Sequence, residues 1–125
     1  MRKVILDTNF LISSFFFKVD FLDEIKNLVG ESLEFLTLDS VVSELNRIGE
    51  TKRKDSKYAK LALKFLKQEK IKVIRSKAKN ADEAILGVAD ENCIVATNDK
   101  ELRKRLKTFK AKVIYLRAKK HLAIG

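Results

Sequence analysis

The stretch VILDTNFLI, residues 4–12, joins a short apolar run to an acid and then to a second apolar run. Its first letters are apolar and mostly β-branched, so we expect a buried strand over residues 3–6. Asp7 follows this strand directly. Apolar spacing after the acid predicts two helices, at roughly residues 10–17 and 20–29. The chain therefore opens as a strand that leads, through an acid, into helices.

The rest of the chain alternates strand-like and helix-like segments. Short apolar runs predict four further strands, at residues 34–38, 71–74, 94–97 and 113–116. Helical spacing predicts further helices at residues 40–48, 58–66, 81–92 and 99–107. Because each strand is a continuous apolar run, we expect a parallel five-stranded sheet covered on both faces. The predicted fold class is α/β, in a three-layer α/β/α sandwich.

Length and composition indicate one domain. The 125 residues are 46% hydrophobic and 35% charged, which favours a globular fold with a heavily charged surface. We expect residues 1–125 to form a single domain, with residues 117–125 as a basic C-terminal tail. The single cysteine, Cys93, excludes an internal disulfide. No apolar stretch reaches the ~20 residues of a membrane span, and Asp7 interrupts the apolar start, so we expect a cytoplasmic protein without a membrane partner.

Positive charge is concentrated at the C-terminal end. The net charge is +10, and most of it lies after position 98. Such asymmetry suggests a polyanion partner, nucleic acid before an anionic membrane, although a solvated surface would also explain it. The cations that we expect to bind RNA are Arg103, Lys104, Arg105, Lys107, Lys119 and Lys120.

Four acids occupy comparable places among the predicted elements. Asp7 follows the first strand and Asp99 follows the fourth, where an open parallel sheet gathers its ligands. Successive residues of a helix are rotated by about 100°, and this rotation places Glu44 at the edge of the apolar stripe of its helix. By the same arithmetic Asp82 lies near the buried stripe of its helix, whereas Glu83 points away. We therefore single out these four carboxylates and leave Glu83 out of the set.

Each acid also has an ordinary structural interpretation. Asn80 with Glu83 resembles a capping box, and Asn98 with Glu101 resembles another. Asp82 and Asp99 would then be first-turn acids favoured by the helix dipole. Similarly, the first of the four acids could start a turn, and the acid at position 44 could be a half-exposed helical residue. The set of four together is what these interpretations do not predict.

Converging carboxylates favour a bound cation. They repel one another and their desolvation raises their pKa values, so such a cluster is stable with a cation between its members. Oxygen-only ligation suits Mg²⁺ or Mn²⁺, as one or two ions. Zn²⁺ is disfavoured because Cys93 and His121 supply too few sulfur or imidazole ligands. His121 fits a surface position better than a catalytic one.

Four motifs together resemble those of the PIN-domain nuclease family, over nearly the whole chain. VILDTNFLI resembles the opening motif, SVVSEL (residues 40–45) the second, ADEAI (81–85) the third and ATND (96–99) the fourth. The resemblance implies the strand order 3-2-1-4-5, with a topological switch between the first and fourth strands. It also implies a shell of residues that orients the carboxylates or metal-bound waters, formed by Thr8, Asn9, Thr97 and Asn98.

Within that family the chain is similar to archaeal single-domain members akin to ribosomal RNA processing nucleases. It also resembles the toxins of toxin-antitoxin pairs. The resemblance implies an endoribonuclease in which divalent cations held by the acids activate a water for attack on an RNA phosphodiester. RNA is the implied substrate, and an antitoxin or a ribosome-assembly protein is the implied partner. The implied catalytic and metal-binding residues are Asp7, Glu44, Asp82 and Asp99.

Two other functions and one interface stay open at this point. A non-catalytic RNA-binding or scaffold protein could share the fold, although it would usually have lost one of the acids. A phosphorylation-type signalling domain is disfavoured because the last predicted strand leads to Arg117 rather than to the required lysine. A cluster of phenylalanines could form either a homodimer surface or an internal core. Its members are Phe10, Phe15, Phe16, Phe17 and Phe21.

Overall fold

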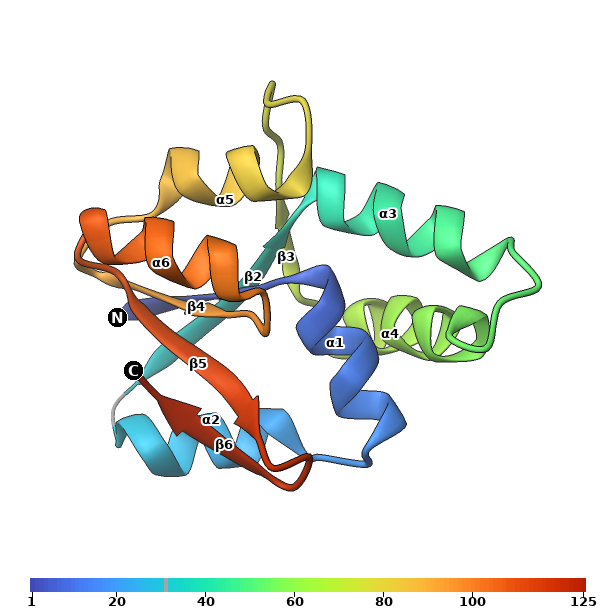
Figure 1. The fold of residues 1–125 in the computed structure, drawn as a ribbon, viewed down its shortest axis with the longest axis horizontal. Coiled ribbons are helices and arrows are strands. Elements are labelled where there is room, and N and C mark those ends of the chain that lie inside the picture. The colour runs from blue at the N-terminus through green and yellow to red at the C-terminus, as the bar shows by residue number, and fades with distance from the viewer. Residues whose placement is uncertain (31) are drawn as a thin grey trace.

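Strands and helices alternate along the chain in the computed structural model, which describes residues 1–30 and 32–125 (Figure 1). The strands are β1 (Arg2–Leu6), β2 (Leu33–Leu38), β3 (Lys72–Ile74), β4 (Cys93–Ala96), β5 (Lys112–Arg117) and β6 (His121–Ile124). The helices are α1 (Thr8–Phe16), α2 (Phe21–Val29), α3 (Asp39–Gly49), α4 (Ser56–Gln68), α5 (Ala81–Val88) and α6 (Lys100–Thr108). The α/β class expected from the sequence is confirmed.

One sheet holds all six of these strands, in the order β3-β2-β1-β4-β5-β6. The strands from β3 to β5 are parallel to their neighbours, and β6 runs antiparallel to β5. The predicted core order 3-2-1-4-5 is confirmed. Because β2 and β4 flank β1 on opposite sides, the chain reverses its direction of winding at β1, and this opens a crevice at the ends of β1 and β4.

The register of β1 against β4 fixes which residues meet at that crevice. Leu6 is paired with Ala96, so the next residue of each strand, Asp7 and Thr97, emerges side by side. The last three residues of β1 and all four of β4 are apolar and buried, as a sheet covered on both faces requires. A polar pair directly after two buried strands therefore lies at the border between the core and solvent.

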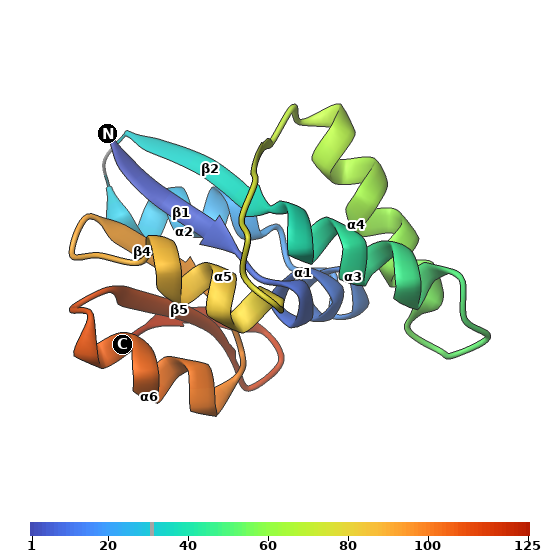
Figure 2. The ribbon, with the colours of Figure 1, turned by 90° about the horizontal axis from the view of Figure 1, so that it is seen from above.

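Helices cover both faces of the sheet. Figures 1 and 2 show α5 and α6 on one face and α2 on the other. Helices α1, α3 and α4 pack against one another beyond the ends of β1 and β2. This arrangement brings α3 and α5 to the two sides of the crevice, where the middle of α3 and the first turn of α5 can contribute side chains.

The phenylalanine cluster is mainly an internal core. Phe10 and Phe21 are buried, with ring centroids 5.6 Å apart in an edge-on contact. Phe15 extends the cluster by edge-on contacts with Phe21 and Phe65. Phe16 is 50% exposed, and Phe17 packs edge-on against it. Of the two interpretations from the sequence, the structure favours the core for Phe10, Phe15 and Phe21.

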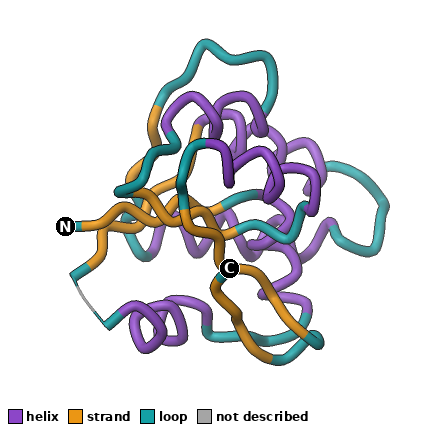
Figure 3. The backbone as a smooth tube through the Cα atoms, turned by 60° about the vertical axis from the view of Figure 1, so that its left-hand side comes forward, coloured by secondary structure: helices purple, strands orange, loops and turns teal. Residues whose placement is uncertain are grey.

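The structure adds a sixth strand within the segment expected to be a basic tail, residues 117–125. Strands β5 and β6 form a hairpin, and Figure 3 shows the strands as a twisted band between helices. Ala118 and Lys119 in its turn both have positive φ, and the Lys120 amide donates to the Arg117 carbonyl at 3.2 Å. Such a turn usually carries Asn-Gly, so Ala-Lys gave no hairpin signal in the sequence.

Helix α5 is shorter than the expected helix over residues 81–92. It ends at Val88, and Ala89 has an extended backbone. The Asp90 carboxylate accepts a hydrogen bond from the Asn92 amide at 2.8 Å, which forms a turn into β4. Within residues 1–30 and 32–125, no helix combines the length and apolarity that crossing a bilayer requires.

Candidate active site

A cavity of about 320 Å³ opens at the ends of β1 and β4. We call it the acid cavity, because the four acids singled out from the sequence all line it. Its lining residues are Asp7, Thr8, Asn9, Glu44, Asn80, Ala81, Asp82 and Asp99. The acids come from four separate places in the fold: the end of β1, the middle of α3, the first turn of α5 and the start of α6. Residues far apart in the chain thus share one space.

Asp7 is the most buried of the four acids and is held by two hydrogen bonds. It is 3% exposed. Its Oδ1 accepts from the Thr8 amide at 2.8 Å, and its Oδ2 accepts from the Thr97 hydroxyl at 2.6 Å. The first bond makes Asp7 the N-cap of α1. The second joins the end of β1 to the end of β4, so the position of this carboxylate is fixed by two strands.

Burial raises the pKa of the Asp7 carboxyl from 3.8 to about 6. The hydrogen bonds from Thr97 and Thr8 oppose this rise because they favour the charged form. The negative charges of Asp82 and Glu44 add to it. The Asp7 carboxyl is therefore mostly ionised only above about pH 6. A positive charge nearby would stabilise its ionised form.

Glu44 and Asp82 lie on facing helices and are both half-buried. Desolvation raises the pKa of Glu44, Arg47 opposes the rise, and repulsion from Asp82 adds to it. Desolvation also raises the pKa of Asp82, repulsion from Asp99 adds to it, and Arg105 opposes it. Each of these carboxylates thus feels the charge of another acid in the same cavity.

The start of α6 corrects one local expectation. The N-cap of this helix is Asp99, whose Oδ1 accepts from the amides of Glu101 at 2.9 Å and Leu102 at 3.2 Å. Asn98 was expected to be the cap, but its Oδ1 instead accepts from the Leu116 amide of β5 at 2.8 Å. Asp99 therefore both caps α6 and lines the acid cavity.

The four polar residues expected to orient the acids connect β1, β4 and their neighbours. Asn9 accepts a hydrogen bond from the Asn98 amide at 3.1 Å. The Thr97 hydroxyl donates to Asp7 and accepts from the Asp99 amide at 3.1 Å. Thr8 and Asn9 line the acid cavity, whereas Thr97 and Asn98 support it from behind. Of the four, only the Thr97 side chain bonds to the acids, so a positioning role for the set stays a prediction.

Replacing Thr97 with valine is expected to lower the free energy of unfolding by about 1.5–3 kcal/mol near neutral pH, because a buried carboxylate loses a hydrogen bond. The control is Thr37→Val, since the buried Thr37 hydroxyl donates to the uncharged Leu6 carbonyl at 2.7 Å. That loss should be about 1 kcal/mol. Only the Thr97 effect should shrink below about pH 6, where Asp7 becomes protonated. Urea denaturation across pH measures both, and identical pH profiles would contradict the assignment.

The cations expected to bind RNA lie on α6 and in the β5–β6 hairpin, and of these Arg105 lies close enough to Asp82 to lower its pKa. In the part of the chain that the structure describes, none of the six lines the acid cavity. Arg105 forms an ion pair with Glu83 at 3.1 Å, and Arg103 stacks on the Tyr115 ring at 3.7 Å. The Lys119 ammonium lies 5.9 Å from the centre of the Phe17 ring. Their role in RNA binding stays a prediction, and their positions in the structure do not by themselves indicate an RNA-binding surface.

Asn80 is a cavity residue that sequence reasoning treated only as a cap. It does cap α5, because its Oδ1 accepts from the Glu83 amide at 2.9 Å. It also lines the acid cavity beside Asp82. The signal available in the sequence was its place two residues before a candidate acid, at the start of a helix that follows a strand.

The four acids line one cavity, but their side chains do not converge on a single metal position. Among residues 1–30 and 32–125, no three His, Cys, Asp or Glu side chains are already arranged to hold a metal ion. The acid cavity nevertheless offers only oxygen ligands from its acids, together with the amide oxygens of Asn9 and Asn80. Oxygen ligands of this kind suit a hard cation, and the described residues that line the cavity offer no thiol for nucleophilic catalysis.

Comparison with known proteins identifies the relatives of this chain. It is 39% identical to Ribonuclease VapC4 of Methanocaldococcus jannaschii, over 99% of this chain and 97% of that protein. It is 30% identical to Ribonuclease VapC9 of Archaeoglobus fulgidus, over 99% of this chain and 90% of that protein. Both alignments span all four acids.

Solved structures show the same fold at lower identity. The PIN domain endonuclease Utp24 superimposes with a TM-score of 0.81 at 23% identity, over 98% of this chain and 90% of that one. VapBC2 from Rickettsia felis, bound to a DNA fragment from their promoter, matches with a TM-score of 0.62 at 16% identity, over 92% and 99%. A sequence profile described as "PIN like domain" matches residues 4–119. The chain therefore belongs to the PIN-like domain family.

Proposed function

We propose that this protein is a metal-dependent endoribonuclease that hydrolyses RNA phosphodiester bonds. Its catalytic and metal-binding residues would be Asp7, Glu44, Asp82 and Asp99. The observation that carries the proposal is that four acids from four separate elements line one cavity. Two relatives at 30% identity or more, both named ribonucleases, support RNA as the substrate.

The residues of the acid cavity fit a divalent cation by their chemistry. Desolvation and mutual repulsion raise the pKa of Asp7, Glu44 and Asp82, and a bound cation would offset both effects. Carboxylate oxygens suit Mg²⁺ or Mn²⁺, as one or two ions. When bound, the metal would supply an activated water and stabilise the leaving oxygen of the phosphodiester.

The chain itself would position these ligands. Asp7 is held in place by Thr97 and by the Thr8 amide, and Asp99 is held by the first amides of α6. Glu44 and Asp82 face the cavity from two helices that contact each other. Above the pKa of Asp7, about 6, its carboxylate is available as a charged ligand. Activity should therefore be greater at neutral than at acidic pH.

The direct test is cleavage of a single-stranded RNA by the purified chain with Mn²⁺, with Mg²⁺ and with EDTA. We expect cleavage with either metal, loss of cleavage in EDTA, recovery when Mn²⁺ is restored, and products with a 5′-phosphate. Equal cleavage in EDTA would contradict the metal dependence. RNA binding without cleavage under every condition would favour the non-catalytic scaffold protein instead.

The wider biological setting follows from the family resemblance and remains a proposal. An antitoxin or a ribosome-assembly protein would be the protein partner, and the cytoplasm would be the location. Self-association is a further expectation that the mostly internal phenylalanine cluster weakens. Solution mass measurement of the purified chain tests it directly.

A further inference from the structure

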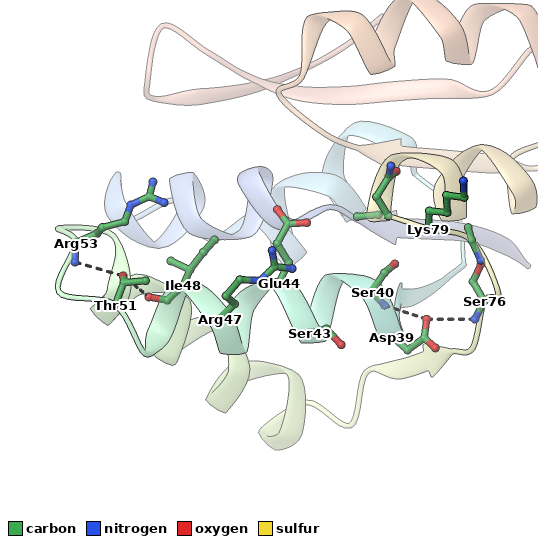
Figure 4. Close-up of a pocket in the computed structure, with 13 residues that line it drawn as sticks. Asp39, Ser40, Ser43, Glu44, Arg47, Ile48, Thr51, Arg53, Ser76 and Lys79 are labelled. Atoms are coloured by element: carbon green, nitrogen blue, oxygen red, sulfur yellow. Dashed lines mark hydrogen bonds between the residues drawn. The ribbon is translucent and has the colours of Figure 1, made fainter.

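A second cavity, of about 640 Å³, lies between α3 and the segment that leads into α5. It shares the lining residues Glu44, Asn80 and Ala81 with the acid cavity, so the two cavities adjoin. We call this second cavity the α3 groove (Figure 4). Its lining residues are Asp39, Ser40, Ser43, Glu44, Arg47, Ile48, Thr51, Arg53, Ser76, Ala78, Lys79, Asn80 and Ala81.

The two walls of the α3 groove are tied together at one end. The Asp39 Oδ1 accepts from the Ser40 amide at 2.9 Å and from the Ser76 amide at 3.1 Å, as the dashed lines in Figure 4 show. The second of these bonds joins the start of α3 to the chain that leaves β3. The two walls of the groove are therefore held in a fixed relative position at this end.

Three cations and several hydroxyls line the α3 groove. The cations are Arg47, Arg53 and Lys79. Arg53 is paired with Asp55 at 3.3 Å, whereas, among the described residues, neither Arg47 nor Lys79 forms an ion pair. Arg47 does lower the pKa of Glu44, which places its positive charge near the acids.

A buried hydroxyl in the same groove lacks a partner. Within residues 1–30 and 32–125, the Ser40 Oγ is buried and makes no hydrogen bond. Figure 4 shows this side chain between α3 and the segment that carries Lys79. Such a group is stabilised by a ligand that can accept or donate a hydrogen bond.

The acid cavity alone would repel an RNA strand. It is lined by four acids, and, in the described part of the chain, no lysine or arginine lines it. A phosphodiester that reaches these acids must therefore be held by cations next to them, in addition to any bound metal. The α3 groove supplies such cations directly beside Glu44, whereas Arg103 and Arg105 of α6 are engaged with Tyr115 and Glu83.

We propose that the α3 groove binds the sugar-phosphate backbone of single-stranded RNA next to the bond that is cleaved, with Arg47 and Lys79 as its main phosphate contacts. This inference rests on the proposed function. In the described residues no aromatic side chain lines the groove, so base stacking is not part of the contact. Binding through the groove should therefore depend on salt and depend little on base sequence.

The test measures RNA affinity without cleavage. Fluorescence anisotropy of a labelled, short single-stranded RNA is recorded in EDTA with Arg47→Ala/Lys79→Ala and with the wild type. The matched control is Lys64→Ala/Arg117→Ala, which removes the same charges from exposed positions that line neither cavity. A third variant, Lys104→Ala/Lys107→Ala, tests α6. Thermal unfolding confirms that each variant is folded.

We expect the groove variant to bind roughly tenfold more weakly than the wild type, because two charge-assisted contacts to phosphate are lost. Its slope of log Kd against log salt should fall by about 1.4, at about 0.7 for each contact to single-stranded RNA. The control variant should change affinity less than the groove variant, and its slope should stay near that of the wild type. In Mn²⁺, the groove variant should raise KM more than it lowers kcat, because the acids are unchanged.

Three results would overturn the inference: no RNA binding by the wild type, equal affinities of the groove and control variants, or a loss confined to the α6 variant. Unchanged RNA affinity in the groove variant, a fourth such result, would also overturn it and would leave the groove to a ligand of another class, such as an acidic peptide. Failure of the proposed function gives a different pattern. In that case RNA binds through Arg47 and Lys79, yet no metal produces cleavage.

Discussion

Replacing Asp7 with asparagine is expected to lower the rate of metal-supported RNA cleavage about a thousandfold and, in the absence of metal, to make the folded protein more stable at neutral pH. The loss of rate follows because the variant removes the charged ligand that is best fixed in the acid cavity. Asparagine is close in shape to aspartate, so the fold should persist. Opposite effects on activity and on stability are typical of a residue kept for its chemistry.

The gain in stability follows from the raised pKa of Asp7. A carboxyl whose pKa is about 6 when folded and 3.8 in its ordinary state binds protons more readily in the folded protein. Its contribution to stability is complete below about pH 4 and is lost as pH rises through about 6. The difference of about two pKa units corresponds to about 3 kcal/mol, which is the upper limit of what Asp7→Asn can recover.

Thermal and urea unfolding in EDTA, from about pH 4 to about pH 8, measure this effect. The stabilisation by Asp7→Asn should be largest at about pH 8 and absent near pH 4. Glu91→Gln is the matched control, because it removes the same charge from an exposed position between α5 and β4. Destabilisation of the Asp7 variant at every pH would show that its hydrogen bonds matter more than its buried charge.

Addition of Mn²⁺ to metal-free protein is expected to raise the free energy of unfolding by about 2.7 kcal/mol when the ion is at a hundred times its Kd. For a chain of this length that corresponds to a rise in Tm of roughly 10 °C. At about pH 5 most Asp7 carries a proton, because its pKa is about 6. The ion must then displace that proton, so its affinity should fall about tenfold and the stabilisation by about 1.4 kcal/mol.

Thermal scans with and without Mn²⁺ at about pH 5 and about pH 7.5 check this prediction. Asp82→Asn should lose most of the metal-dependent shift, since its carboxylate lines the acid cavity. Glu91→Gln should keep the full shift. A shift of equal size in both variants would mean that Mn²⁺ binds elsewhere on the protein.

Much of the fold and the position of the acids could be predicted because both depend on simple periodicities. Continuous apolar runs gave the five parallel strands, and the 100° step of a helix distinguished Asp82, which lines the cavity, from Glu83, which is exposed. Placing Asp7 and Asp99 at the ends of neighbouring strands then required only the order of the elements. Local sequence and tertiary structure agree at these positions.

What could not be predicted depends on contacts between distant segments. From the sequence alone the Asn98 amide oxygen could cap α6, and its pairing with the Leu116 amide of β5 is visible only once β4 and β5 are adjacent. The hairpin turn at Ala118 and Lys119 uses residues that rarely adopt positive φ, so pairing with β5 overrides their local preference. The α3 groove was missed because Arg47 and Lys79 lie 32 positions apart and look like ordinary surface cations.

The two outer strands of the sheet bear on how copies of this protein could meet. Strand β3 has three residues and begins with the exposed Lys72, and β6 has four residues and follows Lys119 and Lys120 in the chain. Short outer strands flanked by lysine are poor templates for joining one sheet to another. If copies of this chain associate, we expect helical surfaces to meet, and we expect little tendency toward fibrous aggregation through the backbone.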